Sequence, residues 1–279
     1  MCKGFGVGKQ RLDTVLAERG LFPSRTRAAA SVMAGEVKVG RGARRALKPG
    51  ELVDPAELLS VDARPAFVSR GGVKLANALE SSGLSVEGVR ALDVGASTGG
   101  FTDCLLQRGA REVIAVDVGY GILDYRLRSD PRVVVLERTN ARELTPAMLP
   151  AARTPPDAPP EMAVIDVSFI SLTKVLGAVT GCLGGDWNAL AMIKPQFEVG
   201  RGRVGKGGVV RDPDARRSAL VEVGRSARSL GVSVLGYHSS GLPGPKGNLE
   251  TFIQLAAAGR AGGAGDDAAL EQMAREVEP

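Results

Sequence analysis

The segment that most constrains the fold of this chain is residues 92–102, with the sequence LDVGASTGGFT. The apolar run at 89–94 predicts a buried strand, and apolar positions from Phe101 to Leu106 predict a helix directly after it. Between them lie small residues, which let backbone N–H groups approach a ligand closely, while the helix N-terminus adds a positive dipole end. A strand, a glycine-rich turn and a helix in this order predict a Rossmann-like unit.

A second strand that ends in a carboxylate supports a nucleoside site at this turn. Residues 112–117 have the sequence EVIAVD, and an acid at that position can bind the hydroxyl groups of a ribose. The turn is neither G-x-G-x-x-G nor G-x-x-x-x-G-K-[ST], so a dinucleotide or a nucleoside triphosphate fits it less well. S-adenosylmethionine carries a nucleoside and an amino acid but no phosphate, and it is the ligand that we expect. A tight turn without any ligand is the alternative.

Strands and helices alternate along the rest of the chain. Apolar strand segments are expected at 89–94, 112–117, 132–136, 161–167, 188–193, 232–237 and 249–256, and helices near 100–108, 171–180 and 213–230. This alternation predicts an α/β fold with a mostly parallel sheet covered on both faces. The tail from Gly259 is rich in alanine, glycine and acids, which predicts a frayed helix or disorder.

The first quarter of the chain carries the whole excess of positive charge. Residues 1–70 hold 13 lysines and arginines against 7 acids, whereas residues 71–279 hold 23 against 24. Two short helices, over 11–19 and from Ser24 onward, and a strand at 37–39 are expected in this part. We expect a small module that faces phosphate groups, although an ordinary solvated surface also explains part of the charge.

Composition excludes several kinds of site. Cys2, Cys104 and Cys182 follow no pattern and His238 is the only histidine, so we expect no zinc site, disulfide framework or Ser-His-Asp triad. No stretch approaches eighteen apolar residues, and the first ten residues lack the apolar segment of a signal peptide. We therefore expect a cytoplasmic protein without a metal, whose catalysis depends on lysines, acids or hydroxyls.

Charged residues lie at the ends of the predicted strands. Asp166 and Lys194 each lie at the end of a predicted apolar strand. Glu250 instead begins the last predicted strand, so the sequence does not decide at which edge of the sheet it lies. Lys74 lies in a helix before the sheet. A chain that simply reaches solvent explains any one of them, but together they favour a site, because ligands bind at the carboxyl ends of parallel strands. A partly desolvated lysine among carboxylates can orient or deprotonate an alcohol.

Six ordered motifs carry a resemblance to a known family. They are SRGGVKL at 69–75, GASTGG at 95–100, DVGYG at 117–121, DVSFIS at 166–171, KPQF at 194–197 and GNLE at 247–250. The segment 11–39 resembles an S4 RNA-binding domain. Together, residues 10–257 resemble the TlyA (hemolysin A-like) family of ribosomal RNA cytidine 2′-O-methyltransferases. This resemblance implies an FtsJ-like, class I methyltransferase fold with a seven-stranded sheet, behind a small α+β S4 domain.

The resemblance also implies domain bounds and catalytic roles. It implies an S4-like domain at 1–63, a linker at 64–70, a methyltransferase domain at 71–258 and a flexible tail at 259–279. Its catalytic tetrad is expected to consist of Lys74, Asp166, Lys194 and Glu250. Lys194 would position or deprotonate the cytidine 2′-hydroxyl, and the other three would tune its charge and hold the ribose.

Binding residues follow from the same resemblance. S-adenosylmethionine is expected to contact turn and strand-end residues, with Asp117 at its ribose and Asn140 near its adenine: Gly95, Ala96, Ser97, Thr98, Gly99, Gly100, Asp117 and Asn140. Ribosomal RNA in ribosomal subunits is expected to contact basic residues of the S4 domain: Arg11, Arg25, Arg27, Lys38, Arg41, Arg44 and Arg45. The oligomeric state is left open.

Three other interpretations compete with this one. A non-catalytic ribosome- or RNA-binding protein would transfer no methyl group to ribosomal subunits. A small-molecule O-methyltransferase would keep its activity after deletion of residues 1–62. A pore-forming hemolysin, as the older family name suggests, is disfavoured because no signal peptide, membrane-spanning stretch or barrel pattern is found in the sequence.

The basic N-terminal module generates the first testable prediction. Its affinity for ribosomal RNA should fall about 100-fold between 50 and 200 mM salt, as expected when roughly four phosphate contacts release their counterions. Binding titrations of the full chain at several salt concentrations measure this slope. An affinity that does not change with salt would contradict docking through these cations.

Overall fold

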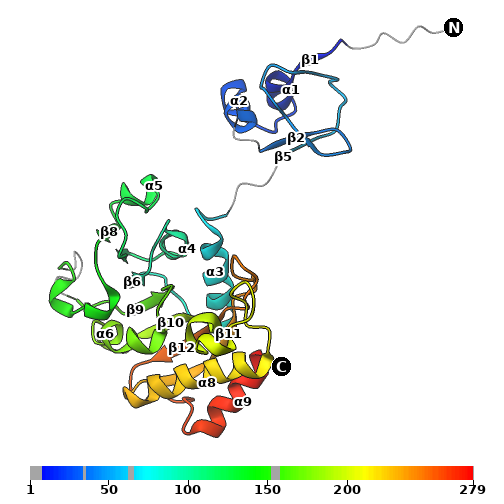
Figure 1. Cartoon of the computed structure of the whole chain (residues 1–279). Helices are drawn as coiled ribbons and strands as arrows, with labels where there is room; N and C mark the ends of the chain where they lie inside the picture. The colour runs from blue at the N-terminus through cyan, green and yellow to red at the C-terminus, as the bar shows by residue number, and fades with distance from the viewer. Residues whose placement is uncertain (1–7, 34–35, 62–65, 152–157, 279) are drawn as a thin grey trace. The chain divides into compact units, whose positions relative to one another are not determined.

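The computed structural model describes residues 8–33, 36–61, 66–151 and 158–278. The chain divides into two compact units, Met1–Ala66 and Phe67–Pro279 (Figure 1). The expected boundary at residues 63 and 64 lies outside the described residues. Ser69 and Arg70, placed in the expected linker, are the N-cap and the first residue of a long helix of the second unit.

The N-terminal unit is a small α+β module. Its elements are β1 (Gln10–Arg11), α1 (Leu12–Glu18), α2 (Arg25–Met33), β2 (Val37–Val39), β3 (Arg44–Arg45), β4 (Leu52–Val53) and β5 (Leu59–Val61). Strands β3, β2 and β5 form an antiparallel sheet, and β1 pairs with β4. Leu12, Leu16 and Val37 are fully buried in one cluster, so this unit has a hydrophobic core of its own.

The C-terminal unit is built on a seven-stranded sheet in the order β11-β12-β10-β9-β6-β7-β8. Its strands are β6 (Arg90–Val94), β7 (Glu112–Val116), β8 (Val133–Leu136), β9 (Met162–Ile165), β10 (Asn188–Ile193), β11 (Ser233–Ser239) and β12 (Thr251–Ala256). Neighbours from β10 to β8 are parallel, and β12 runs antiparallel to both of its neighbours. The predicted α/β fold with a mostly parallel sheet is confirmed.

The reversal of β12 decides where Glu250 lies. Thr251, the first residue of β12, pairs with Ile193, the last residue of β10. Glu250 directly precedes β12, so it reaches the same edge of the sheet as the residues that follow β9 and β10. Glu250 therefore lies at the carboxyl edge of the parallel strands, a position that the sequence alone did not decide.

Helices cover both faces of this sheet (Figure 1). The helical elements are α3 (Arg70–Ser82), α4 (Gly100–Gln107), α5 (Tyr125–Arg128), η1 (Ala141–Glu143), η2 (Pro146–Met148), η3 (Leu172–Lys174), α6 (Leu176–Thr180), α7 (Pro195–Glu198), η4 (Arg201–Arg203), α8 (Pro213–Ser229) and α9 (Asp267–Val277). Ala91 belongs to the core cluster of Leu75 in α3, whereas Leu92 belongs to that of Leu176 in α6. Strands buried on both faces in this way are typical of parallel sheets. No helix in the described ranges is both long and apolar enough to cross a bilayer.

The expectation of a frayed or disordered tail is wrong for residues 267–277. Asp266 caps α9 by accepting a hydrogen bond from the Ala269 N–H at 2.8 Å, and Leu270 and Ala274 are fully buried in the core. Leu270 lies against Gly224 of α8, where any larger side chain would meet it. The alanine-rich, acidic composition hid an apolar stripe at helical spacing, which the core buries.

This packing predicts that Leu270→Ala lowers the free energy of unfolding by about 2–5 kcal/mol, because truncating a fully buried leucine leaves a cavity. The matched control is Glu271→Ala on the exposed side of α9, which should cost no more than about 0.5 kcal/mol. Urea unfolding of the full chain measures both. Equal stability of the two variants would show that α9 contributes nothing to the core.

Candidate active site

Two lysine–carboxylate pairs lie at the carboxyl edge of the sheet. Lys74 of α3 donates a hydrogen bond to Glu250, and the Lys194 ammonium lies 2.5 Å from an Asp166 oxygen. The side chains of Lys74 and Glu250 are only 8% and 2% exposed, and that of Lys194 is 10% exposed. Asp166 follows β9 and Lys194 follows β10, so neighbouring parallel strands bring them together.

All four of these side chains line one cavity of about 790 Å³. Much of the glycine-rich turn lines it as well: Gly95, Ala96, Ser97, Thr98 and Gly100. The structure thus brings the expected tetrad and most of the expected turn residues to a single space. Gly99, Asp117 and Asn140 are not among its lining residues.

The turn after β6 approaches the neighbouring strand closely. Gly95 has φ +88°, and a Cβ there would lie 2.6 Å from the Asp166 carbonyl oxygen. Gly100, the first residue of α4, would place a Cβ 2.9 Å from the Gly72 nitrogen. These positions require glycine, because a side chain would push the turn away from Asp166 and α3. The first turn of α4 also leaves backbone N–H groups without intrahelical partners, which suits a carboxylate.

Two expected ligand residues, Asp117 and Asn140, hold local structure in the segments that follow β7 and β8. The Asp117 carboxylate accepts the Ser97 N–H and the Gly119 N–H, both at 2.7 Å. Asn140 is the N-cap of η1: its side chain accepts the Arg142 N–H at 3.1 Å and donates to Glu143 at 3.0 Å. Ser97 has φ +50°, a strained value for a residue with a side chain, and the hydrogen bond that its N–H donates to Asp117 holds it there.

Asp93 is a buried carboxyl that sequence reasoning did not single out. It lies within β6 with no exposed surface, and burial raises its pKa to about 7, with smaller contributions from Asp166 and Asp117. Thr102 donates to its Oδ2 at 2.6 Å and lowers the pKa in part. Its Oδ1 has no hydrogen-bond partner among the described residues. A charged residue in the middle of an apolar strand was the signal that could have revealed it.

Three further residues complete the cavity near Lys194. Ser168 accepts a hydrogen bond from the Lys194 ammonium at 2.8 Å. Phe169 has φ +64°, is 92% exposed, and its ring centroid lies 5.4 Å from that of Phe197. All three residues line the cavity. Backbone strain and an exposed aromatic ring, both at Phe169, point to a function. Neither feature can be predicted from the sequence of the motif at 166–171.

The expected RNA-binding residues lie on the N-terminal unit and differ in their pairing. Arg11 forms a bidentate hydrogen bond with Asp13, which also lies 3.8 Å from Arg25. The bond from Arg11 is the main cause of the lowered pKa of Asp13. Arg44 pairs with Glu51 at 2.9 Å. The remaining side chains are exposed or half-buried on this unit: Arg27, Lys38, Arg41 and Arg45.

The sheet order, the glycine-rich turn after β6 and the cavity at the carboxyl edge define a Rossmann-like methyltransferase domain. A family model described as FtsJ-like methyltransferase matches residues 67–257, and one described as S4 domain matches residues 10–58. The chain belongs to the TlyA family, in which an S4 domain precedes an FtsJ-like methyltransferase domain. Within the described residues, no group of three or more histidine, cysteine or acidic side chains could hold a metal ion.

Relatives support this assignment over most of their length. The 16S/23S rRNA (cytidine-2′-O)-methyltransferase TlyA of Mycobacterium tuberculosis is 49% identical over 249 residues, which cover 88% of this chain and 90% of that protein. Hemolysin A of Brachyspira hyodysenteriae is 39% identical, covering 86% and 97%. A solved structure from Streptococcus thermophilus, named as a candidate hemolysin, has a TM-score of 0.70 at 38% identity and covers 96% of this chain and 95% of its own.

The buried Asp93 predicts a pH-dependent stability. Its folded pKa of about 7 exceeds the ordinary value of 3.8, so the folded state holds a proton that the unfolded state has lost between these values. Stability contributed by this group is therefore present below pH 4 and is lost as the pH rises to about 7, at up to about 1.4 kcal/mol per pKa unit. Asp93→Asn removes this titration and leaves an oxygen for Thr102.

We expect the stability of Asp93→Asn relative to the wild-type protein to increase steadily from pH 4 to pH 7. Thermal unfolding of both proteins without added ligand measures this difference. The control is Asp186→Asn, whose side chain is 80% exposed and whose difference from the wild-type protein should not change with pH in this direction. A constant difference for Asp93→Asn across that range would show that this carboxyl titrates normally.

Proposed function

We propose that this protein transfers the methyl group of S-adenosylmethionine to the ribose 2′-hydroxyl of a cytidine in ribosomal RNA. The observation that carries the proposal is the convergence of two lysine–carboxylate pairs and a glycine-rich turn on one cavity. The name of the Mycobacterium tuberculosis relative gives the same reaction for that protein, and the S4 domain supports an RNA substrate.

The residues of the turn fit the methyl donor. The glycines at 95 and 100 let the turn pack closely against Asp166 and α3, and N–H groups at the start of α4 suit the carboxylate of a methionine. Asp117 and Asn140 are assigned to the nucleoside end of the donor. When bound, S-adenosylmethionine supplies a methyl group on a positively charged sulfur, so the enzyme needs no covalent nucleophile.

The residues around Lys194 fit the acceptor hydroxyl. Asp166 and Ser168 hold the Lys194 ammonium from the β9 side, and this ammonium borders the cavity. Lys194 would orient the 2′-oxygen toward the methyl group. As the oxygen–methyl bond forms and the sulfur–methyl bond breaks, Lys194 would pass a proton to the Asp166 carboxylate and take up the hydroxyl proton in its place. Most of the rate arises from holding the oxygen in line, since correct positioning alone lowers such barriers by several kcal/mol. The Lys74–Glu250 pair, contributed by α3 and by the residue before β12, also holds the ribose.

The exposed ring of Phe169 fits the base of the same nucleotide. A base inside an RNA helix cannot bring its ribose to a cavity of this kind, so the nucleotide must leave the stack, which costs a few kcal/mol. Stacking on an aromatic ring contributes about 1–3 kcal/mol per base and offsets that cost. The basic N-terminal unit supplies contacts with the RNA backbone. Since the substrate is ribosomal RNA, the proposal places the protein in the cytoplasm.

Lys194→Met tests the proposal most simply. It keeps an unbranched side chain of nearly the same length but removes the ammonium, so kcat should fall about 10²–10⁴-fold, the usual loss for a group that moves or holds the reacting proton. The dissociation constant for S-adenosylmethionine should change less than about 3-fold, which is under 1 kcal/mol. Transfer of labelled methyl groups to ribosomal subunits and calorimetric titration measure these two quantities.

The matched control is Lys174→Met, on the exposed surface of η3, which should behave as the wild-type protein. Methyl transfer at the wild-type rate by Lys194→Met would remove Lys194 from the catalytic site. Loss of donor binding together with activity would instead assign Lys194 to the donor.

A further inference from the structure

Two segments of the chain each carry one half of the Lys194–Asp166 pair. The first, residues 166–171, connects β9 to η3, and the second, residues 194–198, is Lys194 followed by α7. The ion pair joins their first residues, and the ring contact between Phe169 and Phe197 joins their middles. Correct catalytic geometry depends on keeping these two segments in a fixed relation.

A third link joins the far ends of the two segments. Glu198, the last residue of α7, accepts a hydrogen bond from the Ser171 hydroxyl at 2.6 Å and another from the Leu172 N–H at 2.9 Å. Ser171 is the N-cap of η3, where it accepts the Thr173 N–H at 3.2 Å. One carboxylate therefore bridges the end of α7 and the start of η3. Burial raises the pKa of Glu198, and its bonds to Ser171 and Leu172 oppose that shift.

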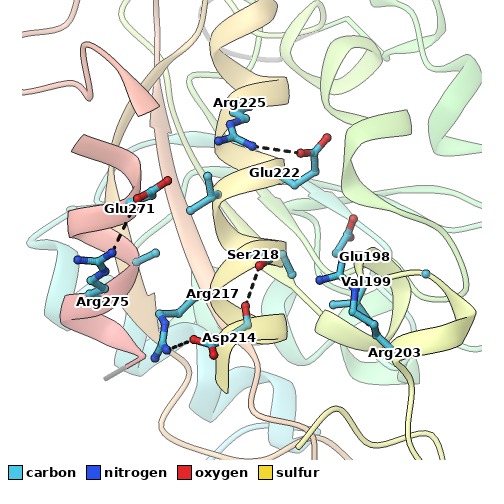
Figure 2. Close-up of a pocket in the computed structure, with 14 residues that line it drawn as sticks. Glu198, Val199, Arg203, Asp214, Arg217, Ser218, Glu222, Arg225, Glu271 and Arg275 are labelled. Carbon is cyan, nitrogen blue, oxygen red and sulfur yellow. Dashed lines mark hydrogen bonds and ion pairs between the residues drawn. The ribbon is translucent and has the colours of Figure 1, made fainter. Parts of the chain in front are cut away.

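The other side of Glu198 borders a second cavity of about 660 Å³, which lies against α8 and α9 (Figure 2). Figure 2 shows that the charged side chains of α8 and α9 there pair with one another: Arg217 with Asp214, Arg225 with Glu222 and Arg275 with Glu271. None of these arginines pairs with Glu198. In the part of the chain that the structure describes, the groups that donate hydrogen bonds to the Glu198 carboxylate lie at the start of η3.

We propose that Glu198 is a positioning residue that holds the 166–171 segment, and with it Asp166 and Ser168, against the Lys194 ammonium. Among the described residues that line the active-site cavity Glu198 does not occur, and its hydrogen bonds run to Ser171 and Leu172 rather than to Lys194. A displacement of about 1 Å at a reacting group can reduce the rate about 100-fold, so a clamp at the far end of both segments affects catalysis without contacting the substrate. The inference rests on the methyl transfer proposed above.

Glu198→Ala and Glu198→Gln separate positioning from general stability. The alanine variant loses both hydrogen bonds, whereas the glutamine variant keeps an oxygen for the Leu172 N–H. We expect kcat to fall about 10–100-fold for Glu198→Ala and less than about 5-fold for Glu198→Gln. The KM for ribosomal subunits and the dissociation constant for S-adenosylmethionine should stay within about 3-fold of the wild-type values, a change below 1 kcal/mol.

The matched control is Glu222→Ala, which lines the same second cavity but lies on α8, with a side chain that is 66% exposed, and which should retain wild-type kcat. Hydrogen exchange of the full chain supplies a readout independent of activity. Glu198→Ala should speed exchange of backbone amides within residues 167–175 and leave the strands of the sheet unchanged.

Any one of four results would overturn the inference. Wild-type kcat in Glu198→Ala, or unchanged exchange at 167–175, would show that the clamp is not needed. Equal loss of kcat, substrate affinity and thermal stability in both variants would show a general structural role. A wild-type protein that transfers no methyl group would overturn the proposed function itself, and the inference with it.

Discussion

The buried ion pair between Lys74 and Glu250 is the interaction on which the arrangement of the site depends. It joins residues 176 positions apart, and both side chains are almost completely buried. An isolated buried charge costs several kcal/mol, whereas a paired one is tolerated, so each of these residues requires the other. The pair can form only because β12 runs antiparallel and delivers Glu250 to the carboxyl edge, where α3 presents Lys74. Sheet topology and site chemistry are therefore linked at this point.

Strain and close approach concentrate around the same cavity. Ser97 and Phe169 both adopt positive φ values, and Gly95 lies against the backbone of Asp166 with no room for a Cβ. Such conformations cost about 1–3 kcal/mol each and persist only where the surrounding structure enforces them. Here the Asp117 carboxylate holds Ser97, and the Phe197 ring contacts Phe169. The scaffold itself thus sets the shape of the cavity.

The sequence predicted the sheet well because each strand is a continuous apolar run with its own turn signals. It predicted the tetrad residues from strand ends and motifs, but the edge reached by Glu250 depends on the reversal of β12, which no local pattern encodes. Ser168, Phe169 and Glu198 were missed as individual residues, because their roles arise where two loops meet. The packing of the helix at 267–277 into the core was not predicted, because composition outweighed a short apolar stripe. The roles of the tetrad, of the turn residues with Asp117 and Asn140, and of the basic residues of the N-terminal unit stay predictions.

The central claim is that the paired lysines and carboxylates present a ribose hydroxyl to a methyl donor. The most direct measurement incubates the full chain with ribosomal subunits and S-adenosylmethionine labelled in its methyl group, then digests the RNA and identifies the labelled nucleoside. We expect the label in 2′-O-methylcytidine. Label on a base, or no label in RNA at all, would contradict it.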